Sequence, residues 1–118
     1  MTDFHVAQVT LVRAGDLLAR GVIDSTEEFV RLGIAVGLAE DARDRVDTPV
    51  AFHTIEDLDP GRVFSVVAAS RSGTLDDEEK LASDLEQYAE AGMRKLLKET
   101  AGETLDWYGL ARRYRTGA

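Results

Sequence analysis

Residues 25–45, STEEFVRLGIAVGLAEDARDR, form the most strongly helical pattern in the chain. Ser25 followed by Glu28 matches a capping box, in which the serine hydroxyl satisfies a free amide of the first helical turn. Apolar residues then recur at helical spacing in two neighbouring stripes, so more than half of the helix surface is apolar. The stripes consist of Phe29, Leu32, Val36 and Ala39, and of Val30, Ile34 and Leu38. This pattern predicts a helix that is surrounded by other elements or by a second subunit.

Gly33 and Gly37 lie four residues apart on one side of this predicted helix. A glycine inside a helix costs about 1 kcal/mol relative to alanine, so the absence of two side chains needs a structural reason. Close crossing by another helix backbone is the natural one. We expect both glycines to lie at the interface of a homo-oligomer.

Composition restricts the class of protein. The chain has 118 residues, no cysteine and an ordinary apolar content, which predicts one globular domain without disulfides or thiolate metal sites. No signal-peptide pattern and no membrane-spanning apolar run is present, so we expect a cytoplasmic protein without a membrane partner. Residues 1–93 hold 8 basic and 19 acidic side chains, a net charge of −11, whereas residues 94–118 hold 6 and 3, a net charge of +3. An acidic body repels nucleic acid, so any DNA contact requires a local basic patch.

Residues 4–12, FHVAQVTLV, are rich in β-branched and aromatic side chains and predict a short strand. Alternation would place Val9 and Leu11 on the face that suits a core, and Gln8 and Thr10 on the other face. A single strand cannot satisfy its own backbone groups, and only residues 50–55 weakly suggest another strand. We therefore expect the strand to pair with its copy in a second subunit, with Val9 and Leu11 at the oligomer interface. The alternative is an edge segment packed on the helices.

The remaining patterns predict helices. The fold class that follows is mostly α, a single domain in which a short N-terminal β-strand precedes about five helices. The expected helices cover residues 13–22, 25–45, 63–73, 74–102 and 104–114. A proline after Asp59 suggests that the third helix begins close to that residue.

Patterns typical of catalysis or metal binding are missing from the sequence. His5 and His53 stand apart, and neither has a neighbour at metal-ligand spacing. No glycine is followed by the Lys-Ser/Thr of a phosphate-binding loop. The acidic run at residues 76–79 suits a solvated helix N-terminus. We expect no enzymatic activity, no catalytic residue, no bound metal and no cofactor.

Basic side chains provide two candidate DNA contacts. Arg13, Arg20 and Arg31 lie on the first two predicted helices, beside the strand, although each also has an acidic neighbour with which it could pair. The second candidate is the C-terminal run at residues 112–115, where three arginines could bind phosphates and Tyr114 could stack on a base. Its arginines are Arg112, Arg113 and Arg115.

The order of strand, short helix and Ser-capped longer helix resembles a ribbon-helix-helix unit. Such units dimerise through the strand, and outward-facing strand residues enter the major groove of DNA. The resemblance implies that Gln8 and Thr10 contact bases, while Ser25 and Thr26 lie near phosphates. Residues 1–45 would form this ribbon-helix-helix-like unit, and residues 46–118 a C-terminal helical part.

Residues 8–98 also resemble the DndE family of DNA sulfur-modification proteins. The resemblance rests on the run FVRLGIAVGLAE, a short helix at residues 63–70 and a later helix end AGMRKLL at residues 91–97, in that order. It implies a small, oligomeric, non-catalytic DNA-binding accessory protein of DNA phosphorothioation, with other DNA-modification proteins as partners. Two alternatives are a ribbon-helix-helix transcription regulator or antitoxin, and a protein-only assembly adaptor.

Overall fold

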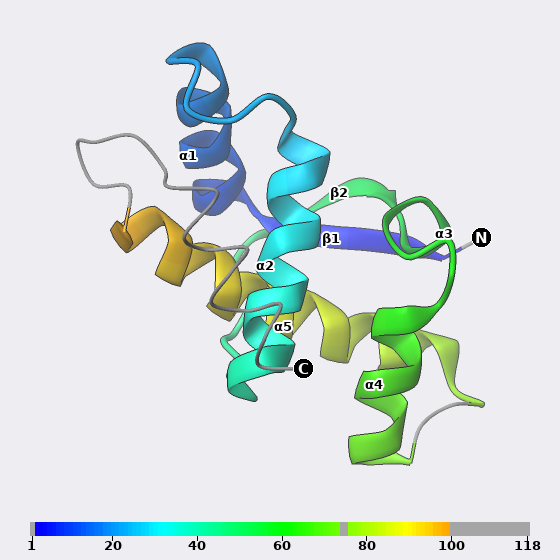
Figure 1. Cartoon of the computed structure of the whole chain (residues 1–118). Coiled ribbons are helices and arrows are strands. Elements are labelled where there is room, and N and C mark those ends of the chain that lie inside the picture. The colour runs from blue at the N-terminus through cyan, green and yellow to red at the C-terminus, as the bar shows by residue number, and fades with distance from the viewer. Residues whose placement is uncertain (1, 74–75, 100–118) are drawn as a thin grey trace.

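The computed structural model describes residues 2–73 and 76–99. These residues are mostly helical, and their two strands form one antiparallel sheet, so the predicted fold class is confirmed (Figure 1). In chain order the elements are β1 (Asp3–Ala7), α1 (Gln8–Ala19), α2 (Thr26–Glu40), β2 (Pro49–Thr54), α3 (Ile55–Leu58), α4 (Val63–Ser72) and α5 (Glu78–Glu99). The helix expected at residues 104–114 lies outside the described residues, and so do Arg112, Arg113 and Arg115.

Helices α2 and α5 cross with their backbones in contact. A Cβ atom on Gly37 would lie 2.0 Å from the backbone oxygen of Tyr88, and one on Gly92 would lie 1.8 Å from the backbone oxygen of Gly33. No carbon atom can approach an oxygen so closely, so only glycine permits this crossing. The close crossing was predicted, but its partner is a helix of the same chain. Gly33 and Gly37 are therefore buried inside the molecule, which corrects their assignment to an oligomer interface.

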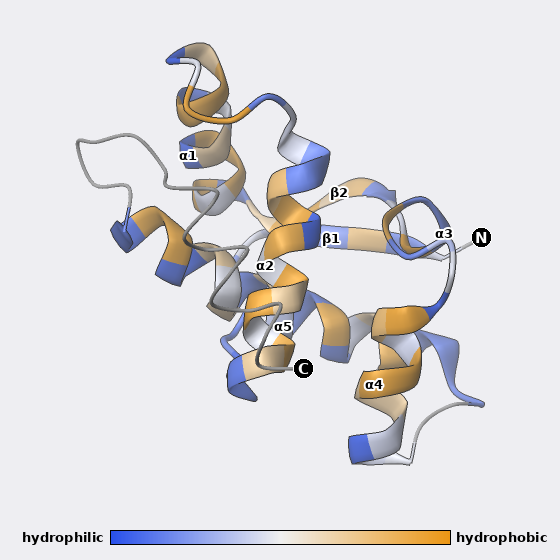
Figure 2. Ribbon diagram, viewed as in Figure 1, coloured by the Kyte–Doolittle hydropathy of each residue, from blue (hydrophilic) through white to orange (hydrophobic). Residues whose placement is uncertain are grey.

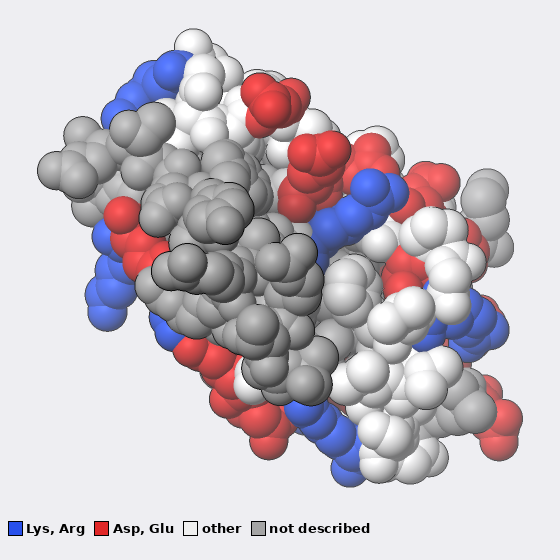
Figure 3. All heavy atoms as spheres, viewed as in Figure 1, with Lys and Arg blue, Asp and Glu red and all other residues white. Residues whose placement is uncertain are grey.

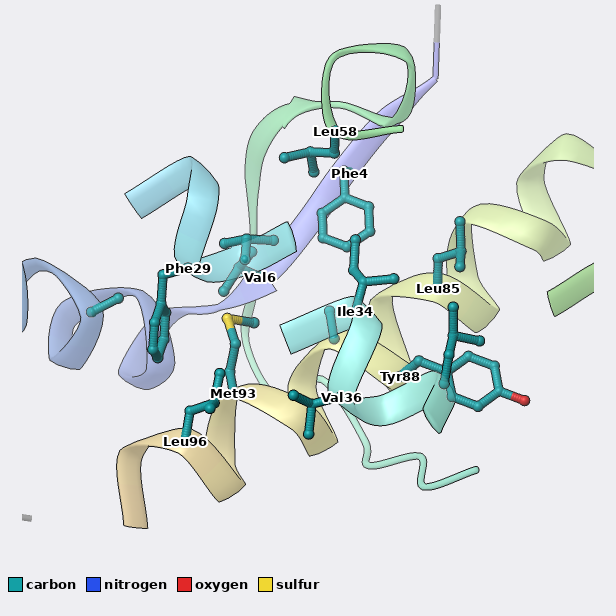
Figure 4. Close-up of a cluster of buried hydrophobic side chains, with 14 of the residues drawn as sticks. Phe4, Val6, Phe29, Ile34, Val36, Leu58, Leu85, Tyr88, Met93 and Leu96 are labelled. Atoms are coloured by element: carbon teal, nitrogen blue, oxygen red, sulfur yellow. The ribbon is translucent and has the colours of Figure 1, made fainter. Parts of the chain in front are cut away.

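The hydrophobic core extends along this crossing (Figure 4). Large side chains from α2, α5 and β1 meet there, and Leu58 of α3 covers one end. The fully or nearly fully buried members that Figure 4 labels are Phe4, Val6, Phe29, Ile34, Val36, Leu58, Leu85, Tyr88, Met93 and Leu96. Because both halves of the chain contribute to one core, residues 1–45 are not a separate folding unit.

Two helix starts follow from side-chain caps. The hydroxyl of Ser25 accepts a hydrogen bond from the Glu28 amide at 3.3 Å, which confirms the predicted cap of α2. Helix α4 begins at Val63, as its apolar pattern predicted, and not directly after Asp59, where the proline suggested a start. The buried Asp59 carboxylate still supplies its cap, because it accepts the amides of Phe64 and Ser65 at 3.2 and 2.8 Å.

The N-terminal strand pairs within the chain. β1 lies antiparallel to β2, with Val6 opposite Val50, so the expected pairing with a second subunit was wrong. The weak strand signal at residues 50–55 marks the true partner. The amide of His5 is also occupied, since it donates to the Glu86 carboxylate at 2.7 Å. A strand added from outside would have to displace that bond.

The second half of the predicted strand is helical. Residues 8–12 form the start of α1, because Thr10, Ala14 and Leu17 then share one buried face at helical spacing. The strand propensity of β-branched side chains is small and depends on context, so packing of this face decides the local structure.

The glycine crossing leads to a stability prediction with an internal control. We expect Gly37→Ala to lower the free energy of unfolding by about 1–3 kcal/mol or more, because the new methyl group overlaps the α5 backbone. Gly15→Ala should raise it by up to about 1 kcal/mol, because a Cβ atom on Gly15 of α1 meets no other atom within 4 Å. Urea unfolding measures both changes. Equal effects of the two substitutions would contradict the crossing.

Candidate interaction surface

Helix α1 presents apolar side chains to solvent. Its inward face consists of Thr10, Ala14 and Leu17, all buried. On the outward side Val9 is 60% exposed and Val12 is 66% exposed. Figure 2 shows hydrophobic residues along α1, which lies at the edge of the molecule. Isolated exposed valines are common, but two on the first turns of one helix mark a surface that another molecule could cover.

A buried charged network holds the inward face of α1. The Glu90 carboxylate, on α5, is fully buried. Its Oε2 atom accepts the Thr10 hydroxyl at 2.7 Å and the Arg94 Nε–H at 2.6 Å. Arg94 also approaches the carboxylates of Asp44 and Asp47, at 4.0 and 3.9 Å. The hydrogen bond to Glu90 is the main cause that raises the pKa of Arg94, so its charge is retained. These contacts fix which side of α1 points outward.

The predicted base-contacting residues do not form one surface. Gln8 is exposed in the first turn of α1 rather than on a strand. Thr10 is buried and bonded to Glu90, so its assignment as a DNA-reading residue was wrong. The predicted interface residues also separate, because Val9 is exposed whereas Leu11 packs against the core.

The three predicted arginines have different roles. Arg13 is exposed and makes no ion pair with the described residues, and Arg20 approaches Asp16 at 3.8 Å. Arg31 is structural, because it donates to the Glu27 carboxylate at 2.6 Å and to the backbone oxygens of residues 57 and 58 at 2.8 and 3.3 Å. Arg31 therefore ties α3 to α2, and only the two arginines of α1 remain available to a phosphate.

Charges of both signs alternate over the visible surface (Figure 3). On the face shown there, the described basic atoms form no continuous stripe. Most described basic residues also have a carboxylate partner: Arg20, Arg31, Arg43, Arg45, Arg71, Arg94 and Lys95. This pairing leaves little concentrated positive charge for a nucleic acid.

Shallow hollows flank Glu86 on α5, and several of the charged groups in them already have partners. Toward β1, the His5 Nδ1 atom lies 2.8 Å from the Glu86 carboxylate. On the other side, Arg43 donates to the carboxylate of Asp84 at 3.2 Å and to the side chain of Gln87 at 2.9 Å. Within residues 2–73 and 76–99, no three acidic or histidine side chains gather closely enough to hold a metal ion.

A second exposed apolar site lies on α4. Val63 and Val66 are 64% and 56% exposed, on the side of α4 opposite the buried Ser65 and Ala69. Figure 1 shows α4 and α1 at opposite ends of the molecule, so the two sites are separate surfaces. Of these exposed valines, only Val9 was predicted to lie at an interface. Helical spacing applied to residues 8–19 would have separated Val12 from the buried face.

Comparison with known proteins identified no relative: no family model, no curated protein and no solved structure matches the chain. The resemblance to the DndE family stays a prediction. Among the described helices, none has both the length and the apolarity needed to cross a membrane.

The buried network predicts that two exposed arginines, Arg94 and Arg45, contribute very different amounts to stability. We expect Arg94→Ala to lower the free energy of unfolding by about 2–3 kcal/mol, because it leaves the Glu90 carboxylate buried without a positive partner. Arg45→Ala should cost less than about 1 kcal/mol, because Arg45 and Asp47 form a surface pair. Thermal and urea unfolding compare the variants. A loss of stability in Arg94→Ala no greater than in Arg45→Ala would rule out this role of Glu90.

Proposed function

We propose that the chain is a non-catalytic assembly protein that binds another protein through the outward face of α1. The observation that carries this proposal is the exposure of Val9 and Val12 on a helix whose opposite face is fixed by Thr10 and Glu90. An apolar surface held in one orientation can bind without first paying a large ordering cost. The protein-only adaptor is therefore the hypothesis that the geometry favours.

The transcription-regulator hypothesis receives less support from the same geometry. It requires a strand shared between subunits, whereas β1 pairs with β2 of its own chain. It also requires Gln8 and Thr10 on one outward strand face, whereas Thr10 is buried. The two features that define base recognition by such units are thus used for internal packing.

Photo-crosslinking from single positions tests the proposal. A photoreactive residue at position 12 should give protein adducts in the native cell, whereas one at position 80, also exposed but on α5, should not. Adding Gly15→Glu on the same face should remove the adducts, and adding Val66→Glu on α4 should leave them. Adducts that survive Gly15→Glu, or their absence at position 12, would refute binding through α1.

DNA contact is a second candidate. The observation that favours it is the exposed guanidinium of Arg13, which makes no ion pair with the described residues, with Arg20 at the C-terminal cap of the same helix. Phosphorothioate modification would be its context if the DndE resemblance holds. Such contact would be local and electrostatic, because the surrounding body is acidic.

A titration at low salt separates the two candidates. Our proposal predicts no binding to intact, nicked or single-stranded DNA. If the second candidate holds, log K should fall with log salt by roughly 0.9 for each phosphate contact on duplex DNA. The double variant Arg13→Ala, Arg20→Ala should then flatten the slope by about two units. Arg62→Ala, at the start of α4, should leave the slope unchanged. A slope that flattens in the double variant but not in Arg62→Ala would refute our proposal and support DNA contact.

A further inference from the structure

The outward side of α1 carries two neighbouring rows of residues. One row consists of Gln8, Val12, Gly15 and Ala19, all exposed and mostly small or apolar. The other consists of Val9, Arg13, Asp16 and Arg20, also exposed, with charges of both signs. Residues separated by three or four positions lie on the same helix side, so each row forms a continuous line.

We infer that the partner of α1 is a second copy of this chain, with the two α1 helices packed antiparallel. This inference rests on the proposed function, because it takes the outward face of α1 as the binding surface. Two features support a copy of the same chain. The first row can pack against the same row of a second chain that runs in the opposite direction. In that arrangement the second row places arginine and aspartate side chains of the two chains near one another.

The small and apolar row has the same spacing in both directions, namely four, three and four residues. Turning a second α1 end for end about the midpoint between Val12 and Gly15 places each Val12 opposite the partner's Gly15. It also places each Gln8 opposite the partner's Ala19. A Cβ atom on Gly15 would meet nothing within 4 Å, so the space above this glycine is open to a valine side chain. Small residues at a crossing allow helices to approach closely.

The charged row supports the antiparallel direction. With a rise of about 1.5 Å per residue, the end-for-end arrangement sets Arg13 about 3 Å along the axis from the partner's Asp16, on the same side of the helix pair. It also sets the two Arg13 residues about 1.5 Å apart along the axis, so each Arg13 lies between the partner's Arg13 and the partner's Asp16. Two reciprocal ion pairs can then form, because Arg13 makes no ion pair among the described residues and Asp16 only approaches Arg20, at 3.8 Å. A parallel two-fold arrangement would instead place the two charged rows on opposite sides of the helix pair, where these ion pairs cannot form. Such a two-fold contact is closed, so it predicts a dimer rather than a filament.

The expected dimer is weak. A helix of 12 residues is about 18 Å long, so a single helix pair buries less than the roughly 800 Å² per partner of a standard interface. We expect a dissociation constant of roughly 10–100 µM.

Sedimentation velocity of the full chain over a concentration series tests the inference. The wild type should shift from monomer to dimer, and Val12→Glu should remain monomeric at every concentration. Val66→Glu, which places the same charge on an equally exposed valine of α4, should dimerise like the wild type. Ala19→Glu, at the other end of the same row, provides a second disrupting variant. Circular dichroism should show that all three variants fold, because each altered residue is exposed.

Cysteine crosslinking tests the direction, since the natural chain contains no cysteine. An equimolar mixture of Val12→Cys and Gly15→Cys chains should form a disulfide between unlike chains faster than either variant alone forms one between like chains. Faster crosslinking of each variant with itself would overturn the antiparallel arrangement. A wild type that stays monomeric up to about 1 mM, or a dimer that survives both glutamates on α1, would overturn self-association. The proposed function fails separately, if no adduct of any protein forms from position 12.

Discussion

Backbone contact between α2 and α5 is the constraint on which the remaining structure depends. Three glycines, Gly33, Gly37 and Gly92, allow two helices that are distant in sequence to touch. Once they touch, the apolar stripes on both helices close into one core, which β1 and α3 cover. Any side chain larger than hydrogen at these positions would separate the helices and open that core.

Polar residues on α5 then position the N-terminal elements. Glu86 holds β1 through the amide and ring of His5, and Glu90 holds α1 through Thr10. Helix α1 is consequently fixed with the hydroxyl of Thr10 inside, beside Ala14 and Leu17, and with two valines outside among polar residues. The Glu90 carboxylate is paired through one oxygen, but its Oε1 atom is buried without a hydrogen-bond partner among the described residues, which costs stability. Stability alone therefore does not explain this arrangement. An outward apolar face on a rigidly held helix is the feature that most strongly indicates a binding function.

Local features of the fold were predictable from the sequence. The cap at Ser25, the apolar stripes and the unusual glycines depend on neighbouring residues, so the helix and its close crossing were recognised. The partner of that crossing was not, because nothing in the glycines distinguishes a helix of the same chain from one of another subunit. Residues 8–12 were misassigned because valine and threonine suit a strand or a buried helix turn. The helix is favoured by packing of the Thr10, Ala14 and Leu17 face, which includes a bond from Thr10 to Glu90, 80 residues away.

The candidate site was the least predictable part. The exposure of Val12 follows from the orientation of α1, which is set by contacts with α5 that are distant in sequence. Arg31 looked available for DNA for the same reason: its true partners include the backbone of residues 57 and 58, which no local pattern brings near α2. The type of each side chain suggested a role for it, but contacts between residues distant in sequence determine whether the side chain is exposed or paired.

The central claim, that the outward face of α1 binds a second copy of this chain, is tested most directly by NMR on a dilution series of the full chain. Amide resonances of each residue report contact without any substitution. We expect concentration-dependent shifts that cluster at Gln8, Val12, Gly15 and Ala19, with resonances of α4 unchanged. Shifts that cluster at Val63 and Val66 instead, or no shift in α1 at any concentration, would contradict it.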